Sequence, residues 1–170
     1  MTAISKWWTP AAFAMLAGIA MGEAGDLPPG LMDRDLRFDI GSMQVKPHLG
    51  FGWSVAEQVG PRTYRWINHL EADVHFSVPA ARDGEIWLDA KPLYLPYRRQ
   101  TVALYINSQY VGQWICGDDP VFTWHRLPVT ASLLNAGDNT LTIRTAYRTR
   151  IGTDSRELSL CVDTILIRFP

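Results

Sequence analysis

The stretch that decides the fold class is DVHFSVPAARDGEIWLD, residues 73–89. Apolar and polar residues alternate through 73–78 and again through 85–89, and residues 79–84 between them are rich in turn-forming types. Successive side chains of a β-strand point to opposite faces, so this alternation predicts two strands that each bury one face. Residues 79–84 are the predicted turn between them.

The same pattern recurs in the rest of the chain. Residues 101–107 alternate and lead through Asn107-Ser108-Gln109, a predicted hairpin turn, into Tyr110–Ile115. Residues 141–145 alternate after the turn 136–139, and 158–169 form a last, strongly apolar strand. No long amphipathic helical pattern follows residue 43. The sequence therefore predicts an all-β antiparallel sandwich of about eight strands.

Composition fits one domain and argues against nucleic acid as a partner. The chain has 170 residues, a net charge of −1 and an isoelectric point near 6.4. Without a basic excess it has little to offer a phosphate backbone, so no nucleic-acid binding is expected. Cys116 and Cys161 could form a disulfide or remain two buried thiols, and the sequence favours neither.

An apolar N-terminal segment, Trp7–Met21, precedes the β-patterned region. Lys6 before it and small residues within and after it match a secretory signal peptide. We expect the segment to be retained as an anchor, with the following domain on the periplasmic side of the cell membrane. Its roughly 22 Å of helix is short against a hydrocarbon core of about 30 Å.

Such a short segment either spans the bilayer with Ala3–Ile4 and Trp7–Trp8 at one interface or lies in the membrane interface, and the helices of a partner would help either arrangement. The residues expected to make these membrane or partner contacts are Trp7, Trp8, Phe13, Leu16 and Ile19. An ordinary buried helix is the alternative, although proline and glycine make poor helix interior. The predicted organisation is an anchor or uncleaved signal segment at 1–25, a linker at 26–43 and the β-domain at 44–170.

Several motifs, in order, carry a resemblance to a known group of domains. The main ones are Gly52-Trp53-Ser54 with Glu57, and Asp154-Ser155-Arg156-Glu157-Leu158 near the last strand. Over about residues 50–170 the chain resembles the jelly-roll, galactose-binding-like domains appended to bacterial membrane glycosyltransferases and envelope proteins. It lacks a glycosyltransferase region, so no catalytic role carries over. We expect Asp154 and Arg156 to form an internal ion pair.

No catalytic or metal-binding motif is evident. His69, Glu71, Asp73 and His75 share one strand face, but the two histidines would lie about 20 Å apart at ~3.3 Å per residue. They are predicted to form a polar row facing solvent. No nucleophile elbow, phosphate loop or paired-cysteine motif occurs. The chain is therefore expected not to be an enzyme, and no cofactor or metal is predicted.

Aromatic residues supply a candidate surface for a glycan or a protein partner. Sugar rings stack their C–H faces on aromatic planes, while carboxylates and arginines hold the hydroxyl groups. Trp87 lies on the same side of its predicted strand as Glu85 and Asp89, opposite Ile86 and Leu88, so we expect it to face outward. Trp53 and Trp66 are expected to fill the core or its rim. The candidate surface residues are Trp87, Trp114, Trp124, Tyr94, Tyr97, Arg98, Arg99 and Asp118.

Two functions fit these features. The first is a non-catalytic accessory subunit of a bacterial membrane protein assembly, such as a photosynthetic or respiratory supercomplex, whose partners are other subunits and the membrane interface. The second is an envelope carbohydrate-binding module with a glycan as its ligand. The retained anchor favours the first function. The resemblance to jelly-roll domains and the many aromatic residues favour the second.

Overall fold

A computed structural model of the chain describes residues 28, 30–32 and 34–170. These residues form ten β-strands and two short 3-10 helices, η1 (Lys46–His48) and η2 (Ala131–Leu133). The strands are β1 (Leu36–Asp39), β2 (Glu57–Val59), β3 (Arg62–Ile67), β4 (Glu71–Val78), β5 (Gly84–Pro92), β6 (Thr101–Ile106), β7 (Gln109–Ile115), β8 (Thr123–Val129), β9 (Gly137–Thr145) and β10 (Leu160–Arg168).

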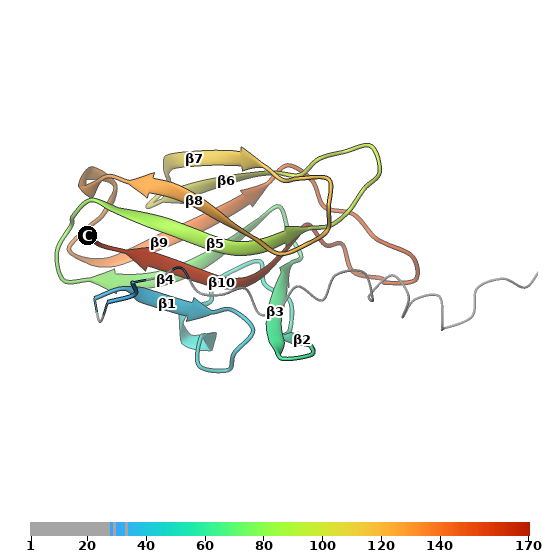
Figure 1. Cartoon of the computed structure of the whole chain (residues 1–170), viewed down its shortest axis with the longest axis horizontal. Helices are drawn as coiled ribbons and strands as arrows, with labels where there is room; N and C mark the ends of the chain where they lie inside the picture. Colours follow the sequence, from blue (N-terminus) through green and yellow to red (C-terminus); the bar gives the residue numbers. More distant parts are fainter. Residues whose placement is uncertain (1–27, 29, 33) are drawn as a thin grey trace, which may run out of the picture.

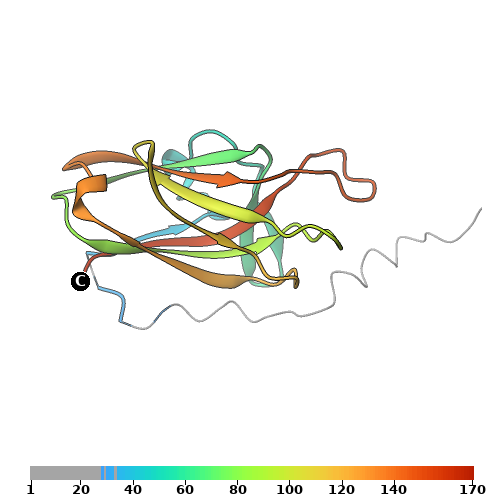
Figure 2. The same ribbon diagram turned by 90° about the horizontal axis from the view of Figure 1, so that it is seen from above.

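The strands form two antiparallel sheets that pack face to face (Figures 1 and 2). One sheet has six strands in the order β2-β3-β10-β5-β8, with β1 paired to the second half of β10. The other has four strands in the order β4-β9-β6-β7. This architecture agrees with the predicted jelly-roll sandwich. The turn 79–83 leads from β4 in the four-stranded sheet to β5 in the six-stranded one, and both strands bury one side as their alternation predicts.

The core lies between the two sheets and is built from the apolar halves of the alternating strands. Ile86 and Leu88 of β5 are fully buried. They belong to the same core cluster as Leu104 and Ile143 of the opposite sheet, which are buried as well. The hairpin between β6 and β7 turns at Asn107 and Ser108, whose φ angles are +50° and +67°. Two successive positive φ values define the turn that suits a two-residue hairpin, which confirms the predicted turn.

The β-structure starts earlier than the predicted boundary at residue 44. Strand β1 lies inside the stretch predicted as a linker and pairs with β10, more than a hundred residues away. Phe38 and the following Ile40 belong to the core. A strand of four residues is too short to show a clear alternation, and its stability comes from β10. The three-residue β2 escaped prediction for the same reason.

Other sequence predictions can now be compared with the structure. Arg156 donates to Asp154 with an N–O distance of 2.7 Å, which confirms the predicted ion pair, and it also reaches Glu57 at 2.6 Å. Both cysteines are free and buried, and burial raises the pKa of Cys116 to about 11. The predicted anchor 1–25, with its docking residues, lies outside the described residues. Within them, no helix has the length and hydropathy needed to cross a bilayer.

Candidate functional site

The outer face of the six-stranded sheet carries a group of five aromatic side chains that contact one another or shared cations. We call it the outer aromatic face and define it by Tyr64, Trp66, Trp87, Phe122 and Trp124. The pleat of the sheet places them there, because Ile86 and Leu88 point into the core and Trp87 between them must point outward. Pairing of β5 with β8 sets Asp89 opposite Trp124.

Two of the predicted residues, Trp87 and Trp124, come together on this face. Their ring centroids are 6.4 Å apart and their planes meet at 72°, an edge-to-face arrangement. The Trp87 indole nitrogen donates to Glu85 at 3.0 Å, and Arg126 is also bound to Glu85. Both indoles are half-buried. The pair is therefore a fixed platform that remains partly open to solvent.

Guanidinium groups flank this platform. The Arg126 guanidinium carbon lies 5.3 Å from the centre of the Trp87 ring, and that of Arg168 lies 6.0 Å from it. These are cation–π distances, and they hold the ring in one orientation. Their remaining N–H groups are donors in a fixed planar fork, which suits hydroxyl or carboxylate groups of a ligand.

The indole N–H of Trp124 is buried and meets no acceptor within the part of the chain that the structure describes. Leaving a buried donor unpaired costs about 1–3 kcal/mol. Sites with such an unsatisfied group call for a specific explanation, since most buried polar groups are paired. Here the unpaired donor lies on the same face as the indole platform.

A buried ion pair lies beneath the middle of the outer aromatic face. Arg62 of β3 reaches Asp89 at 2.6 Å and Asp163 at 2.7 Å, and all three side chains are at least 86% buried. Burial raises the pKa of Asp89 and raises that of Asp163 to about 6, the Arg62 charge opposing the rise in both. Arg62 also lies 4.2 Å from the centre of the Phe122 ring, so the ion pair fixes this aromatic side chain too.

Lys91 extends the face toward β3. Its ammonium lies 5.0 Å from the Phe122 ring, 5.3 Å from Tyr64 and 5.8 Å from Trp66. Burial raises the pKa of Tyr64 to about 12. The phenol therefore stays neutral at any physiological pH, and the lysine supplies the positive charge at this end of the face.

The other predicted surface residues lie elsewhere. Trp114 points inward at the open edge between β7 and β8, where it stacks on His125 with centroids 4.6 Å apart. Burial lowers the pKa of His125, so this contact is between neutral rings.

Tyr94, Tyr97, Arg98 and Arg99 lie on the 93–100 loop, at the end of the sandwich where β5 finishes, and Asp118 lies on the neighbouring loop after β7. Tyr97 is fully exposed, and Arg98 lies over the ring of Tyr147 at 4.4 Å. Arg99 forms a bidentate ion pair with Asp118, both side chains being more than half exposed. These residues form no joint site with Trp87 and Trp124.

Several residues of the outer aromatic face were missed from the sequence. Trp66 was expected to fill the core or its rim, and Arg62, Lys91 and Phe122 were not singled out. The parity of positions 62, 64 and 66 on β3 was an available signal, because Ile67 must point into the core. Phe122 carried none, since it precedes β8 in an irregular loop.

Glu71, Asp73 and His75 of the predicted row lie on the outer face of the four-stranded sheet, whereas His69 precedes β4 and its ring packs against Phe51 instead. Each of the three bonds across to β9. No group of three or more potential metal ligands occurs among the residues that the structure describes.

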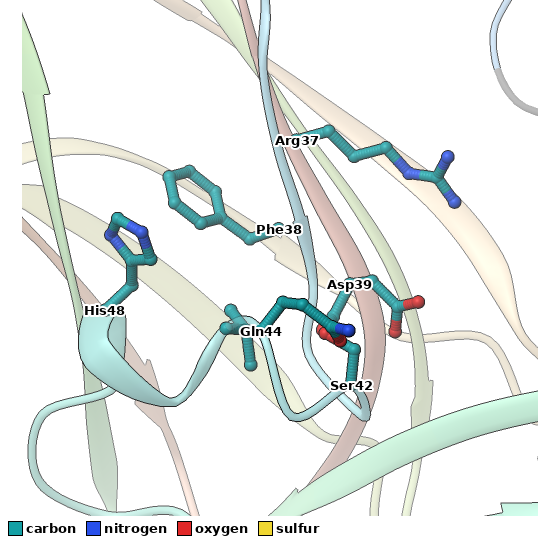
Figure 3. A pocket seen from close by; sticks show the side chains of 7 residues that line it. Arg37, Phe38, Asp39, Ser42, Gln44 and His48 are labelled. Atoms are coloured by element: carbon teal, nitrogen blue, oxygen red, sulfur yellow. The ribbon is translucent and has the colours of Figure 1, made fainter.

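A pocket of about 470 Å³ opens beside β1, at the edge of the six-stranded sheet. Figure 3 shows Phe38 and His48 on one side of the strand and Arg37 and Asp39 on the other. The two rings meet edge to face, with centroids 5.1 Å apart. The amide of Gln44 lies on the same side as Asp39. The pocket thus has an aromatic wall and a polar wall.

Among solved structures, this sandwich is similar in fold to carbohydrate-binding modules. Neither a family model nor a curated protein matches the chain. A β-(1,4)-mannanase from Podospora anserina with a family 35 carbohydrate-binding module matches with TM-score 0.54 and 16% identity, over 81% of this chain and 28% of that chain. The chain thus corresponds to about a quarter of the mannanase's length.

Two further matches are single modules. The C-terminal family 6 carbohydrate-binding module of a laminarinase from Zobellia galactanivorans matches with TM-score 0.52 and 8% identity, over 79% of this chain and 99% of that chain. A family 35 module from Clostridium thermocellum gives TM-score 0.49 and 16% identity, over 71% and 90%. At these identities the two matches with TM-scores of 0.54 and 0.52 show the fold alone, a jelly-roll β-sandwich, as predicted.

Proposed function

We propose that this chain is a non-catalytic glycan-binding module whose ligand lies on the outer aromatic face. The observation that carries the proposal is the Trp87–Trp124 pair, held open on a sheet face by Glu85, Arg126 and Arg168. The fold is that of a sandwich found in carbohydrate-binding modules. Together these features favour the second of the two functions predicted from the sequence.

The chemistry of the face fits a sugar chain. Two indoles at 72° present one ring face and one ring edge, and a pyranose can stack its C–H face on the former. The guanidinium donors beside Trp87 and the carboxylate of Glu85 are suited to bind hydroxyl groups. Because these side chains are already fixed by one another, the ligand would lose less free energy to ordering them.

The test is binding of the full chain to β-(1,4)-mannan, laminarin and a broad glycan array, with affinities measured by calorimetry. Trp87→Ala and Trp124→Ala should each weaken binding about tenfold or more, the typical loss when a buried aromatic anchor is truncated. Tyr110→Ala is the matched control, because Tyr110 is an exposed aromatic residue paired with Tyr105 in the other sheet.

Circular dichroism should confirm that each variant is folded. Arg126→Ala, at a side chain 58% exposed, offers a milder second variant, and it should lower the affinity with little change in stability. Absence of binding to every glycan, or tryptophan variants that bind as tightly as the control, would overturn the proposal.

The membrane-assembly subunit and the export of the domain remain predictions from the apolar segment Trp7–Met21. The two are compatible with a glycan-binding domain, since an anchored module would carry its binding face on the extracytoplasmic side. Deleting residues 1–25 should release the chain from membranes and leave its glycan affinity unchanged. A deletion variant that loses the affinity would point to the anchor, or to a partner bound there, as part of the site.

A further inference from the structure

The pocket beside β1 has polar groups that no neighbour uses. Among the residues that the structure describes, the Arg37 guanidinium and the Gln44 amide have no hydrogen-bond partner, although both line the pocket. Asp39 uses one carboxylate oxygen to accept from Thr63 at 3.1 Å. Its second oxygen is left for a ligand.

His48 adds an acceptor to this set. Its Nδ1 lies 3.0 Å from the backbone oxygen of His75, and a carbonyl oxygen only accepts, so Nδ1 carries the hydrogen. In the neutral ring Nε2 is then an acceptor. The pocket therefore offers donors from Arg37, acceptors from Asp39 and His48, and both from the Gln44 amide. That mixture matches a polyhydroxylated ligand, whose hydroxyl groups donate and accept.

Strand register connects the pocket with the outer aromatic face. Arg37 pairs with Leu166 of β10, Leu166 pairs with Trp87 of β5, and Trp87 pairs with Arg126 of β8. The four residues form one row across the sheet, on its outer side. Two strand spacings separate Arg37 from Trp87, which is about 9.5 Å. Leu166 between them points to the same side and is fully buried, so neighbouring side chains cover it and a ligand crossing the row would lie on those side chains.

We propose that this pocket is an end subsite of the glycan-binding face, so that the ligand is a linear oligosaccharide running across the strands. One sugar stacks on Trp87, and the chain extends past β10 until its terminal residue enters the pocket beside β1. Arg37 and Asp39, on the outer side of β1, hold the hydroxyl groups of that residue together with the Gln44 amide, while His48 lies on the other side of the strand and closes the aromatic wall. The inference rests on the proposed function and adds the direction of the chain and the need for a minimum ligand length.

The test is a length series of β-(1,4)-linked mannooligosaccharides and of laminarin oligosaccharides, bound to the full chain in calorimetry. In the unaltered protein, affinity should rise with length until the ligand spans from Trp87 to the pocket, and then level off. The double variant Arg37→Ala/Gln44→Ala should lose about tenfold in affinity for the long ligands and nothing for the shortest ligand that binds. Arg82→Ala/Gln113→Ala, at exposed positions away from both sites, is the matched control.

The outcomes separate the two proposals. If Arg37→Ala/Gln44→Ala follows the unaltered protein at every length, the end subsite is wrong while glycan binding stands. If Trp87→Ala fails to weaken any ligand but Arg37→Ala/Gln44→Ala weakens all of them, the ligand sits in the pocket alone and the proposed chain direction is wrong. If the unaltered protein binds no oligosaccharide, both proposals fall. Should the double variant not fold, Gln44→Ala alone provides the same comparison.

Discussion

The two outer faces of this sandwich share one backbone architecture and differ in what their side chains do. On the four-stranded sheet, polar side chains bond in pairs across the strands: Glu71 with Arg144 at 2.9 Å, Asp73 with Thr142 at 2.7 Å and His75 with Thr140 at 3.1 Å. On the six-stranded sheet, indoles and guanidiniums alternate above a buried ion pair, Arg62 with Asp89 and Asp163.

The difference indicates which arrangement of outer side chains is enough for a stable sheet and which goes beyond that. Exposed cross-strand pairs are enough to give a sheet a stable, solvated outer side. Burying three charges beneath half-exposed tryptophans is harder, because desolvation can exceed the attraction between the charges. A face kept in that form is better explained by a ligand than by folding, which supports placing the glycan on the six-stranded sheet.

The largest expected effect comes from removing the buried charge. Arg62→Met leaves Asp89 and Asp163 buried without their shared guanidinium and removes the cation that holds Phe122. Breaking one partner of a buried ion pair typically destabilises by about 3–5 kcal/mol. Urea unfolding followed by tryptophan fluorescence should show this loss.

The matched control is Arg144→Met on the four-stranded sheet. Arg144 also has a carboxylate and an aromatic partner, Glu71 and Tyr105, but its side chain is 52% exposed. Its loss should cost about 1 kcal/mol or less. Equal losses for Arg62→Met and Arg144→Met would mean that the two faces do not differ energetically in the way proposed.

A smaller effect, on the order of 3 kcal/mol, is expected from pH. Burial and the neighbouring Asp89 raise the pKa of Asp163 to about 6, above its usual value near 3.8. Between about pH 4 and pH 6 the folded protein keeps a proton that the unfolded chain has released. This contribution to stability is therefore full below pH 4, is lost as the pH rises to 6, and changes no further above it.

Asp163→Asn checks this sign. The variant cannot release the proton, so its stability relative to the unaltered protein should rise between pH 4 and pH 6 in urea unfolding at fixed ionic strength. Asp89 has a raised pKa for the same reason and adds to the same trend. Asp138→Asn, at an exposed position of β9 on the other sheet, should leave the pH dependence unchanged. A difference between Asp163→Asn and the unaltered protein that stays constant with pH would contradict the prediction.

The sandwich could be predicted from the sequence because its long strands bury one face each. Alternation in β4, β5, β6 and β9 reports that burial directly, and the Asn107-Ser108 turn reports a hairpin. β1 and β2 could not be found this way. Both are too short to show an alternation. In addition, β1 pairs with the distant β10, whereas β2 pairs with β3 directly after it in the chain.

The candidate site was predicted only in part, for a related reason. Trp87 alternates with the buried Ile86 and Leu88, so the sequence of β5 alone places it on the outer face. Its meeting with Trp124, and the separation of both from Trp114 and Tyr97, depends on which strands pair. The Arg62–Asp89–Asp163 cluster joins three strands from distant parts of the sequence, and no spacing rule links those positions. The pocket beside β1 was hidden because four of its seven lining residues, from Arg37 to Ser42, fell in the predicted linker.

An intermediate effect is expected at the border of the outer aromatic face. Arg156 binds Glu57 of β2 and Asp154, and in this way fastens the loop between β9 and β10 to the sheet. Hydrogen bonds from Arg156 lower the pKa of Asp154 to about 2. Arg156→Ala should destabilise by about 1 kcal/mol, because these groups are partly exposed.

Limited proteolysis measures the local part of this effect. Cleavage within residues 146–159 should become faster in Arg156→Ala, while cleavage elsewhere stays slow. Arg150→Ala, at an exposed position of the same loop, is the control. Equal cleavage rates in the two variants would show that the loop is not fastened through Arg156.

The smallest effect should come from the polar row itself, and it is the sharpest test of the contrast between the faces. His75→Ala removes an exposed side chain. Its ring nitrogen lies 3.1 Å from the Thr140 hydroxyl, and this hydrogen bond competes with water. The free energy of unfolding should change by less than about 0.5 kcal/mol, as for surface substitutions generally. Glycan affinity should not change at all, since the row lies on the opposite side of the core from Trp87. A loss of affinity in His75→Ala comparable to that in Trp87→Ala would move the ligand to the four-stranded sheet and reverse the assignment of the two faces.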